Sequence, residues 1–245
     1  MILVLIEQLS TSKNLLKSAS KLAAQLGKSF GILTSVGHTE LQLLLNEISI
    51  SEYTIFMNDK SKTLVEICES EEISFLFIQL LDNKLIRIQL KICRDLRIPY
   101  IFYKNSFGTL DLTKVILPVG FLEEELEKAQ FATAFGRFCG SEIKMLLAND
   151  YGSKAATNAE KMKELFDKFE FSFTMEKATK DSFKIENESI QIAEKENAGM
   201  IIISASRDYG LDDLIFGPKE YQVVKKSAIP VLLVNPRGDL YALCD

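Results

Sequence analysis

Short apolar runs alternate along the chain with longer segments in which apolar residues recur at helical spacing. In the first half the runs cover 2–7, 30–36 and 75–78. The segment after the first run carries one apolar helical stripe, formed by Leu15, Ala19, Leu22, Ala23 and Leu26. Strands that are separated by helices predict parallel pairing with right-handed crossovers.

The second half shows the same alternation more clearly. Strands are predicted at 115–120, 143–149, 170–176, 200–204 and 230–234, and helices at 123–138, 157–168, 186–197 and 217–227. Thr157 and Glu160 have the spacing of a capping box, which predicts a helix start there. The third strand is predicted from alternating apolar residues, namely Phe169, Phe171, Phe173 and Met175.

The two halves repeat one order of elements. The opening run 2–7 has an echo at 115–120, and a predicted helix follows each. Each helix is followed by a glycine, Gly27 in one half and Gly140 in the other. A glycine directly after a helix is the expected left-handed cap, so we expect both to have positive φ.

The repeat predicts two tandem domains, 1–109 and 110–245, in a chain of 245 residues. Each is expected to be a doubly wound three-layer α/β/α sandwich on a five-stranded parallel sheet. Ligands of such folds bind beyond the carboxyl ends of the strands, where the strand order reverses. A site is therefore expected just after the first and fourth strand of each half.

Charge and cysteine usage narrow the classes of partner and compartment. The net charge of −5 disfavours nucleic acid and anionic membranes as main partners, because phosphate binding needs a basic footprint. No Cys-x-x-Cys pair occurs, which favours a reducing compartment, and a cytoplasmic location is expected. Cys68, Cys93 and Cys139 lie among apolar residues and are expected to be buried, whereas Cys244 is near the C-terminus.

One stretch carries a family resemblance. Residues 201–218 read IIISASRDYGLDDLIFGP, and 223–234 end in Ile-Pro-Val-Leu-Leu-Val. This order of strand, glycine-bearing loop, helix start and final Pro-Val-Leu strand resembles the C-terminal signature of universal stress proteins. Leu117-Pro118-Val119 resembles the first strand of that family. The resemblance implies the adenine nucleotide alpha hydrolase-like fold. It also implies dimerisation, as an intramolecular pseudo-dimer of the two domains and as a homodimer of chains.

ATP-binding members of the family carry Gly-x2-Gly-x9-Gly-Ser/Thr after the fourth strand. The glycines let the backbone approach the phosphates, and the helix start supplies N–H donors. The matching positions in the second half are Ser204, Arg207, Gly217 and Pro218, so only one glycine is kept. Pro218 has neither an N–H group nor a hydroxyl. The nucleoside-binding aspartate of the family falls at Gly120 in the second half and at Glu7 in the first.

Several residues allow a functional and a purely structural interpretation. Arg207 and Arg237 either hold an anion or are solvated loop residues. The acidic residues that follow Arg207 either bind a divalent cation or cap the next helix; they are Asp208, Asp212 and Asp213. Glu7 contacts a base or ribose, or else is a solvated carboxylate at a strand end. His38 is the only histidine, and no catalytic or zinc motif accompanies it.

The sequence therefore favours a non-enzymatic stress-response or regulatory protein that acts by binding unidentified protein partners. We expect no catalytic residue, no metal and no ATP held in the family's usual way. The alternative hypothesis is an adenine nucleotide sensor that binds ATP or AMP in the second-domain crevice. The candidate cofactor-binding residues are Gly120, Ser204, Arg207, Gly217, Pro218 and Glu7.

Overall fold

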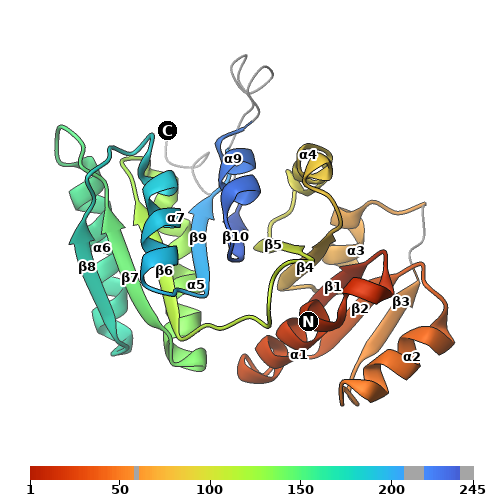
Figure 1. Cartoon of the computed structure of the whole chain (residues 1–245). Helices are drawn as coiled ribbons and strands as arrows, with labels where there is room; N and C mark the ends of the chain where they lie inside the picture. Colours follow the sequence, from red (N-terminus) through yellow and green to blue (C-terminus); the bar gives the residue numbers. More distant parts are fainter. Residues whose placement is uncertain (58–60, 207–217, 238–245) are drawn as a thin grey trace. The chain divides into compact units, whose positions relative to one another are not determined.

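The chain divides into two compact units, Met1–Leu110 and Asp111–Asp245. The computed structural model, drawn in Figure 1, describes residues 1–57, 61–206 and 218–237. Each unit contributes five strands.

The first unit has a wholly parallel sheet in the order β3-β2-β1-β4-β5. Its strands are β1 Ile2–Ile6, β2 Phe30–Thr34, β3 Thr54–Met57, β4 Phe75–Leu80 and β5 Tyr100–Lys104. Its helices are α1 Lys13–Gln25, α2 His38–Glu47, α3 Leu64–Ser70 and α4 Ile86–Cys93, with short 3-10 turns at Leu9–Thr11 and Asn83–Leu85. The central strands β1 and β4 are buried almost throughout, so they form the centre of this core.

The second unit repeats that order as β8-β7-β6-β9-β10, again wholly parallel. Its strands are β6 Lys114–Val119, β7 Glu142–Leu147, β8 Phe173–Lys177, β9 Met200–Ser204 and β10 Val231–Val234. Its helical segments are η3 Glu123–Lys128, α5 Ala129–Ala134, η4 Phe135–Cys139, α6 Lys154–Phe169, α7 Ile185–Lys195 and α9 Lys219–Lys226. The predicted α/β class with five-stranded parallel sheets is confirmed.

In both units the order of the strands reverses at the centre of the sheet. From β1 the chain passes to β2 on one side and later to β4 on the other side. In the second unit it likewise passes from β6 to β7 on one side and later to β9 on the other. The loops that follow the two central strands therefore diverge, which opens the expected crevice at their carboxyl ends.

Two local predictions in the second half were wrong. The helix predicted to start at Thr157 starts at Lys154, and Thr157 donates from its hydroxyl to the carbonyl of Ser153 instead of forming a capping box. The strand predicted at 170–176 starts only at Phe173, because α6 continues to Phe169. Of the alternating residues, Phe169 ends α6 and only Phe173 and Met175 lie in β8; the ring of Phe166 packs against those of Phe171 and Phe173.

The helix predicted at 123–138 is present as three successive segments. It begins as the 3-10 segment η3, continues as α5 and ends in a π-helical turn at Phe135–Cys139. The glycine prediction is confirmed at both ends of the repeat, with φ of 60° at Gly27 and 68° at Gly140. Such left-handed positions favour glycine because a Cβ atom is strained there.

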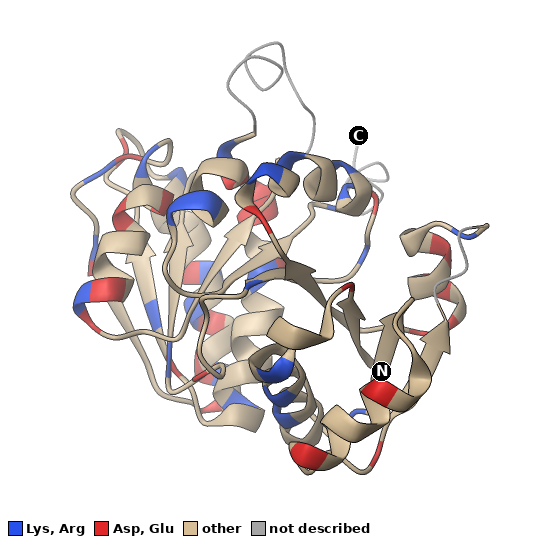
Figure 2. Ribbon diagram, turned by 45° about the vertical axis from the view of Figure 1, so that its right-hand side comes forward, with Lys and Arg blue, Asp and Glu red and all other residues tan. Residues whose placement is uncertain are grey.

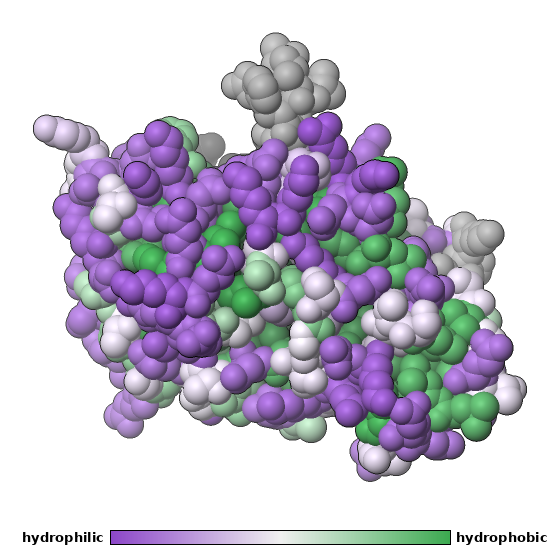
Figure 3. All heavy atoms as spheres, in the orientation of Figure 1, coloured by the Kyte–Doolittle hydropathy of each residue, from purple (hydrophilic) through white to green (hydrophobic). Residues whose placement is uncertain are grey.

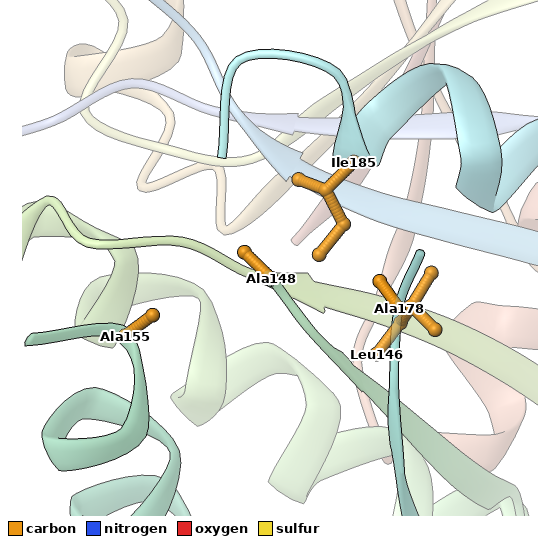
Figure 4. Close-up of a cluster of buried hydrophobic side chains, with 5 residues drawn as sticks. All are labelled: Leu146, Ala148, Ala155, Ala178 and Ile185. Atoms are coloured by element: carbon orange, nitrogen blue, oxygen red, sulfur yellow. The ribbon is translucent and has the colours of Figure 1, made fainter. Parts of the chain in front are cut away.

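Small apolar residues form a cluster beneath the carboxyl end of the second sheet (Figure 4). Ala148 follows β7, Ala155 lies in the first turn of α6, and Ile185 begins α7; Leu146 and Ala178 complete the cluster. Because these side chains are short, the starts of α6 and α7 approach the strand ends closely. The loops that carry the candidate site rest on this cluster.

The cysteine prediction is confirmed for two of the residues. Cys68 and Cys93 are buried, and burial raises the pKa of the Cys68 thiol to about 12. Cys139 is only partly buried, which corrects the prediction, because it lies in the final π-helical turn rather than beneath the sheet. Cys244 lies outside the described residues.

The surface is mainly hydrophilic on the face drawn in Figure 3, and Figure 2 shows acidic and basic residues interspersed on helices and loops. No helix within the described ranges is long and apolar enough to cross a membrane.

Candidate functional site

The crevice of the second unit lies between the carboxyl ends of β6 and β9. These strands pair directly, with Val115 opposite Met200, and they end at Val119 and Ser204. Gly120 therefore follows one wall of the crevice, and Ser204 ends the other. The structure brings these two predicted residues to the same end of the sheet.

The loop after β6 is held by side chains from two other loops and helices. The side-chain amide of Asn158, on α6, donates to the carbonyls of Gly120 and Leu122 at 3.0 and 2.8 Å. The backbone N–H of Phe121 donates to Ser182 Oγ at 3.0 Å. Ser182 is itself bound to Asp150 through its hydroxyl and its backbone N–H. A Cβ atom on Gly120 would lie only 2.9 Å from Ser182 Oγ, so the space for a side chain at this position is filled.

Charged side chains of the unit itself fill the region beyond β6 and β9. The buried ammonium of Lys128 pairs with Glu125 within η3, and these residues are 1% and 5% exposed. Lys219, in the first turn of α9, pairs with the buried Glu186 of α7 at 3.0 Å. Glu220 is 1% exposed and accepts from Ser206 at 2.8 Å.

This charged cluster contains three carboxyl groups and two ammonium groups, and burial among them shifts the pKa of two of the carboxyl groups. Burial raises the pKa of Glu186, and the nearby carboxylate of Glu125 raises it further, although Lys219 opposes both effects. Burial likewise raises the pKa of Glu220, against the hydrogen bond from Ser206. Charged forms of both acids are disfavoured because little solvent reaches them.

One amide side chain bridges the ends of β1 and β4 at the crevice of the first unit. Gln79, near the end of β4, is 1% exposed, and its Oε1 accepts from the backbone N–H groups of Glu7 and Gln8 at 2.9 Å each. Its Nε2 donates to the carbonyl of Gln8 at 2.7 Å and to Thr11 Oγ1 at 3.0 Å. Gln79 thus ties the loop after β1 to the end of β4, across the position where a ligand would enter.

The comparisons with known proteins rest on structure alone. No family model matches the chain, and no curated protein does. A universal stress protein from Archaeoglobus fulgidus DSM 4304 superposes with a TM-score of 0.69 at 15% identity, covering 97% of each chain. A putative universal stress protein from Pseudomonas aeruginosa UCBPP-PA14 gives a TM-score of 0.67 at 15% identity, covering 96% of this chain and 92% of that one.

A protein of unknown function from Pseudomonas aeruginosa PAO1 gives a TM-score of 0.65 at 15% identity over the same shares of the two chains. The chain has the two-domain fold of the universal stress proteins. The superpositions extend over both units, so the tandem arrangement of the universal stress protein fold, and not only one half of it, is shared.

The other predicted cofactor-binding residues in this universal stress protein fold have different surroundings. The side chain of Glu7 is exposed, and only its backbone takes part in the bonds to Gln79. Pro218 is buried at the start of α9. Ser204 is 3% exposed, and its hydroxyl has no hydrogen-bond partner in the part of the chain that the structure describes. Arg207 and Gly217 lie outside the described residues.

Of the residues that allowed both a functional and a structural interpretation, the structure describes only some. The backbone N–H of Arg237 donates to the carboxylate of Glu127 at 3.0 and 3.1 Å. His38 is exposed at the start of α2. The three aspartates predicted as a cap or cation site, Asp208, Asp212 and Asp213, lie outside the described residues. Within residues 1–57, 61–206 and 218–237, no group of three or more His, Cys, Asp or Glu side chains is arranged to hold a metal ion.

Sequence reasoning missed the residues that fill the two crevices. Gln79 had a visible signal, since it is the one polar residue in the buried run 75–80. The sequence separates Glu125 from Glu186 and Glu220 by several elements, and no spacing rule joins them. Ser182 carries no signal at all, because its role depends on the absence of a side chain at Gly120.

Proposed function

We propose that this chain is a stress-response or regulatory protein that acts by binding partners, without catalysis, and that it does not hold ATP in the crevice used by its family. The observation that supports the proposal is that both crevices are filled from within. Gln79 bridges the strand ends at one of them, and Ser182 lies at the other with the buried carboxyl groups of Glu125, Glu186 and Glu220.

Electrostatics add to the steric argument in the second unit. A triphosphate in this crevice would lie beside three carboxyl groups that face only two ammonium groups, those of Lys128 and Lys219. An incoming phosphate would have to compete with Glu125 and Glu186 for these two ammonium groups, which already have partners within the unit. Backbone N–H donors are also reduced, because Pro218 at the start of α9 has none.

The test is nucleotide binding to the purified full chain, measured in two ways. Native mass spectrometry of freshly prepared protein is expected to show the bare chain mass, and calorimetric titration with ATP, ADP or AMP in the presence of Mg²⁺ is expected to show no saturable heat. An ATP-binding universal stress protein, titrated with the same nucleotide stocks, is the positive control. A retained adenine nucleotide, or saturation in calorimetry, would establish the alternative function of a nucleotide sensor.

The proposed partners are a second copy of the chain and proteins not yet identified. We propose that the two domains pair within the chain and that two chains form a homodimer. Light scattering coupled to size-exclusion chromatography measures this directly, with twice the chain mass expected. A mass of one chain over a wide concentration range would contradict the homodimer.

A role in stress is tested in the source cell. Deleting the gene is expected to reduce survival under starvation, heat or oxidant without creating a nutritional requirement. A strict nutrient requirement in the deletion strain would instead indicate a missing enzyme and contradict the proposal.

A further inference from the structure

A second cavity opens beside the loop after β6, separate from the filled crevice. It has a volume of about 330 Å³ and lies between residues 121–123 and the first two turns of α6. Cavities of 300 Å³ and more are typical of sites for small molecules. The strand-end crevice lies between β6 and β9, whereas this cavity lies against α6, the helix that follows β7.

One wall of the cavity is a polar stripe of α6. Lys154, Thr157, Asn158 and Lys161 all line it, and their spacing of i, i+3, i+4 and i+7 places them on one side of the helix. The neighbouring stripe of α6 packs into the core through buried Ala155, Ala159, Met162 and Phe166. Helical periodicity thus divides α6 into an apolar side toward the sheet and a cationic side toward the cavity.

The other wall is apolar and held in place. Phe121 and Leu122 line the cavity, and Leu122 is 39% exposed. The hydrogen bonds from Asn158 to the carbonyls of Gly120 and Leu122, with that from the N–H of Phe121 to Ser182, fix the backbone on both sides of these residues. The ring of Phe121 also packs edge to face on Phe183, at 5.5 Å between centroids. Exposed apolar side chains on a backbone held this firmly form a preorganised contact surface.

The charge of the cavity is positive, although the chain as a whole is negative. Lys154 and Lys161 face one acidic residue of the lining, Glu123, whose carboxylate lies 3.6 Å from Lys161 Nζ. Both partners of that pair are at least half exposed, so the pair is weak. Glu123 therefore competes with an incoming anion for Lys161 and does not cancel the charge of Lys154.

We propose that this cavity binds a small anion with a flat apolar body, of the class of aryl carboxylates, sulfonates or phosphates. The anionic group lies at Lys154 and Lys161, and the apolar body lies against Phe121 and Leu122. The site deepens the proposed binding function by giving the second unit a ligand. It does not depend on the β6–β9 crevice, so it stands whether or not ATP binds there.

The test uses two fluorescent probes on the full chain. Anilinonaphthalene sulfonate has the charge and shape of the proposed ligand, and N-phenylnaphthylamine is its uncharged analogue. Their dissociation constants are measured for the wild type, for Lys154→Ala, Lys161→Ala and Glu123→Gln, and for Lys168→Ala. The last is the matched control, because Lys168 is an exposed lysine on the same helix but does not line the cavity. Circular dichroism melts establish that each variant is folded.

The expected result is a split between the two probes. Each lysine variant of the cavity weakens the sulfonate roughly threefold to tenfold, whereas Glu123→Gln strengthens it by a similar factor. The uncharged probe is unaffected by all three, and Lys168→Ala changes neither probe. The proposal is overturned if the wild type does not bind the sulfonate, if Lys168→Ala weakens it as much as the cavity variants do, or if Glu123→Gln also weakens it.

A Phe121→Ala variant tests the apolar wall. It is expected to weaken both probes, because it removes contact area and leaves the charges in place. Unchanged affinity for both would place the probes elsewhere on the chain and overturn the assignment. Nucleotide titrations are read separately, so a positive result for ATP would contradict the proposed function without affecting this site.

Discussion

Ser182 occupies the space that a side chain at Gly120 would need. Its Oγ lies 2.9 Å from the position of a Cβ atom on that glycine, and Asp150 holds the serine by both its hydroxyl and its backbone N–H. The universal stress protein resemblance puts a nucleoside-binding aspartate at this position. At Gly120 the space for a side chain is therefore taken by a local hydrogen-bond network of Ser182 and Asp150.

This relationship predicts a steric cost at position 120. Gly120→Ala is expected to destabilise the chain by about 1–3 kcal/mol, because the serine and its bonds to Asp150 must shift. Urea denaturation measures the change. Gly108→Ala is the control, since Gly108 is exposed and a Cβ atom there meets nothing within 4 Å.

A second substitution tests whether Ser182 is the cause of the destabilisation by Gly120→Ala. In Gly120→Ala with Ser182→Gly, the clash is removed, so the two substitutions are expected to be less destabilising together than the sum of their separate effects. Additive effects would show that Ser182 is not what excludes a side chain. Gly120→Asp alone is expected not to confer nucleotide binding, because the added carboxylate has no free space.

Gln79 predicts a stability loss in the first unit. Gln79→Met keeps the length of the side chain but leaves the backbone N–H groups of Glu7 and Gln8 without their acceptor. An unpaired buried polar group costs about 1–3 kcal/mol, and these two bonds are only partly buried, so a loss of about 1–2 kcal/mol is expected in total. Gln42→Met, at an exposed position of α2, is the control and is expected to change stability by less than about 0.5 kcal/mol. Equal effects of the two substitutions would refute the role of Gln79.

The sequence predicted those features of the fold that depend on residues close together in the chain. The α/β class with parallel sheets was predicted from the alternation of apolar runs and helices, and the left-handed caps were predicted from Gly27 and Gly140. The start of α6 was misplaced because Thr157 and Glu160 have the spacing of a capping box, whereas the helix begins directly after Ser153, whose carbonyl accepts from Thr157. The start of β8 was placed too early because Phe169, which ends α6, and Phe171, which lies between the two elements, continue the alternation of the strand.

The candidate site depended on contacts between distant residues, and most of it could not be predicted. The family motif drew attention to Gly120 and Ser204, which do lie at adjoining strand ends. It could not show that Glu125 and Glu186 enter the same buried cluster, because such pairing is decided by tertiary packing. The polar stripe of α6 that lines the cavity could have been predicted, since Lys154 and Lys161 are seven positions apart on a helix that also has an apolar stripe.

Thiol reactivity separates the cysteines by burial. In a Cys244→Ser variant, Cys68 and Cys93 are expected to react with a disulfide reagent only on unfolding. With the pKa of Cys68 raised to about 12 by burial, only about one Cys68 thiol in ten thousand is ionised at pH 8. Burial also raises the pKa of Cys93. Two thiols that are slow in native protein and fast in urea, located by mass spectrometry at these positions, are the expected result. Rapid native labelling of Cys93 would contradict its burial.

The buried acid Glu220 predicts how stability changes with pH. Burial raises its pKa in the folded protein above the unfolded value, so the folded state holds the proton more tightly. Its contribution to stability is complete below the unfolded pKa and is lost as pH rises through the folded pKa. Glu220→Gln removes this penalty and can still accept a hydrogen bond from Ser206.

The variant is therefore expected to be more stable than the wild type at pH 7, with a gain that shrinks as pH falls toward the unfolded pKa of about 4.5. A relief of about 1 kcal/mol corresponds to a rise in melting temperature of roughly 2–4 °C for a domain of 150–250 residues. Melting curves of both proteins from pH 4.5 to pH 8 measure the gain, and Glu160→Gln, on the exposed face of α6, serves as the control. A gain that grows toward acid pH would mean that Glu220 is ionised and stabilising, and that the buried cluster attracts charge instead of excluding it.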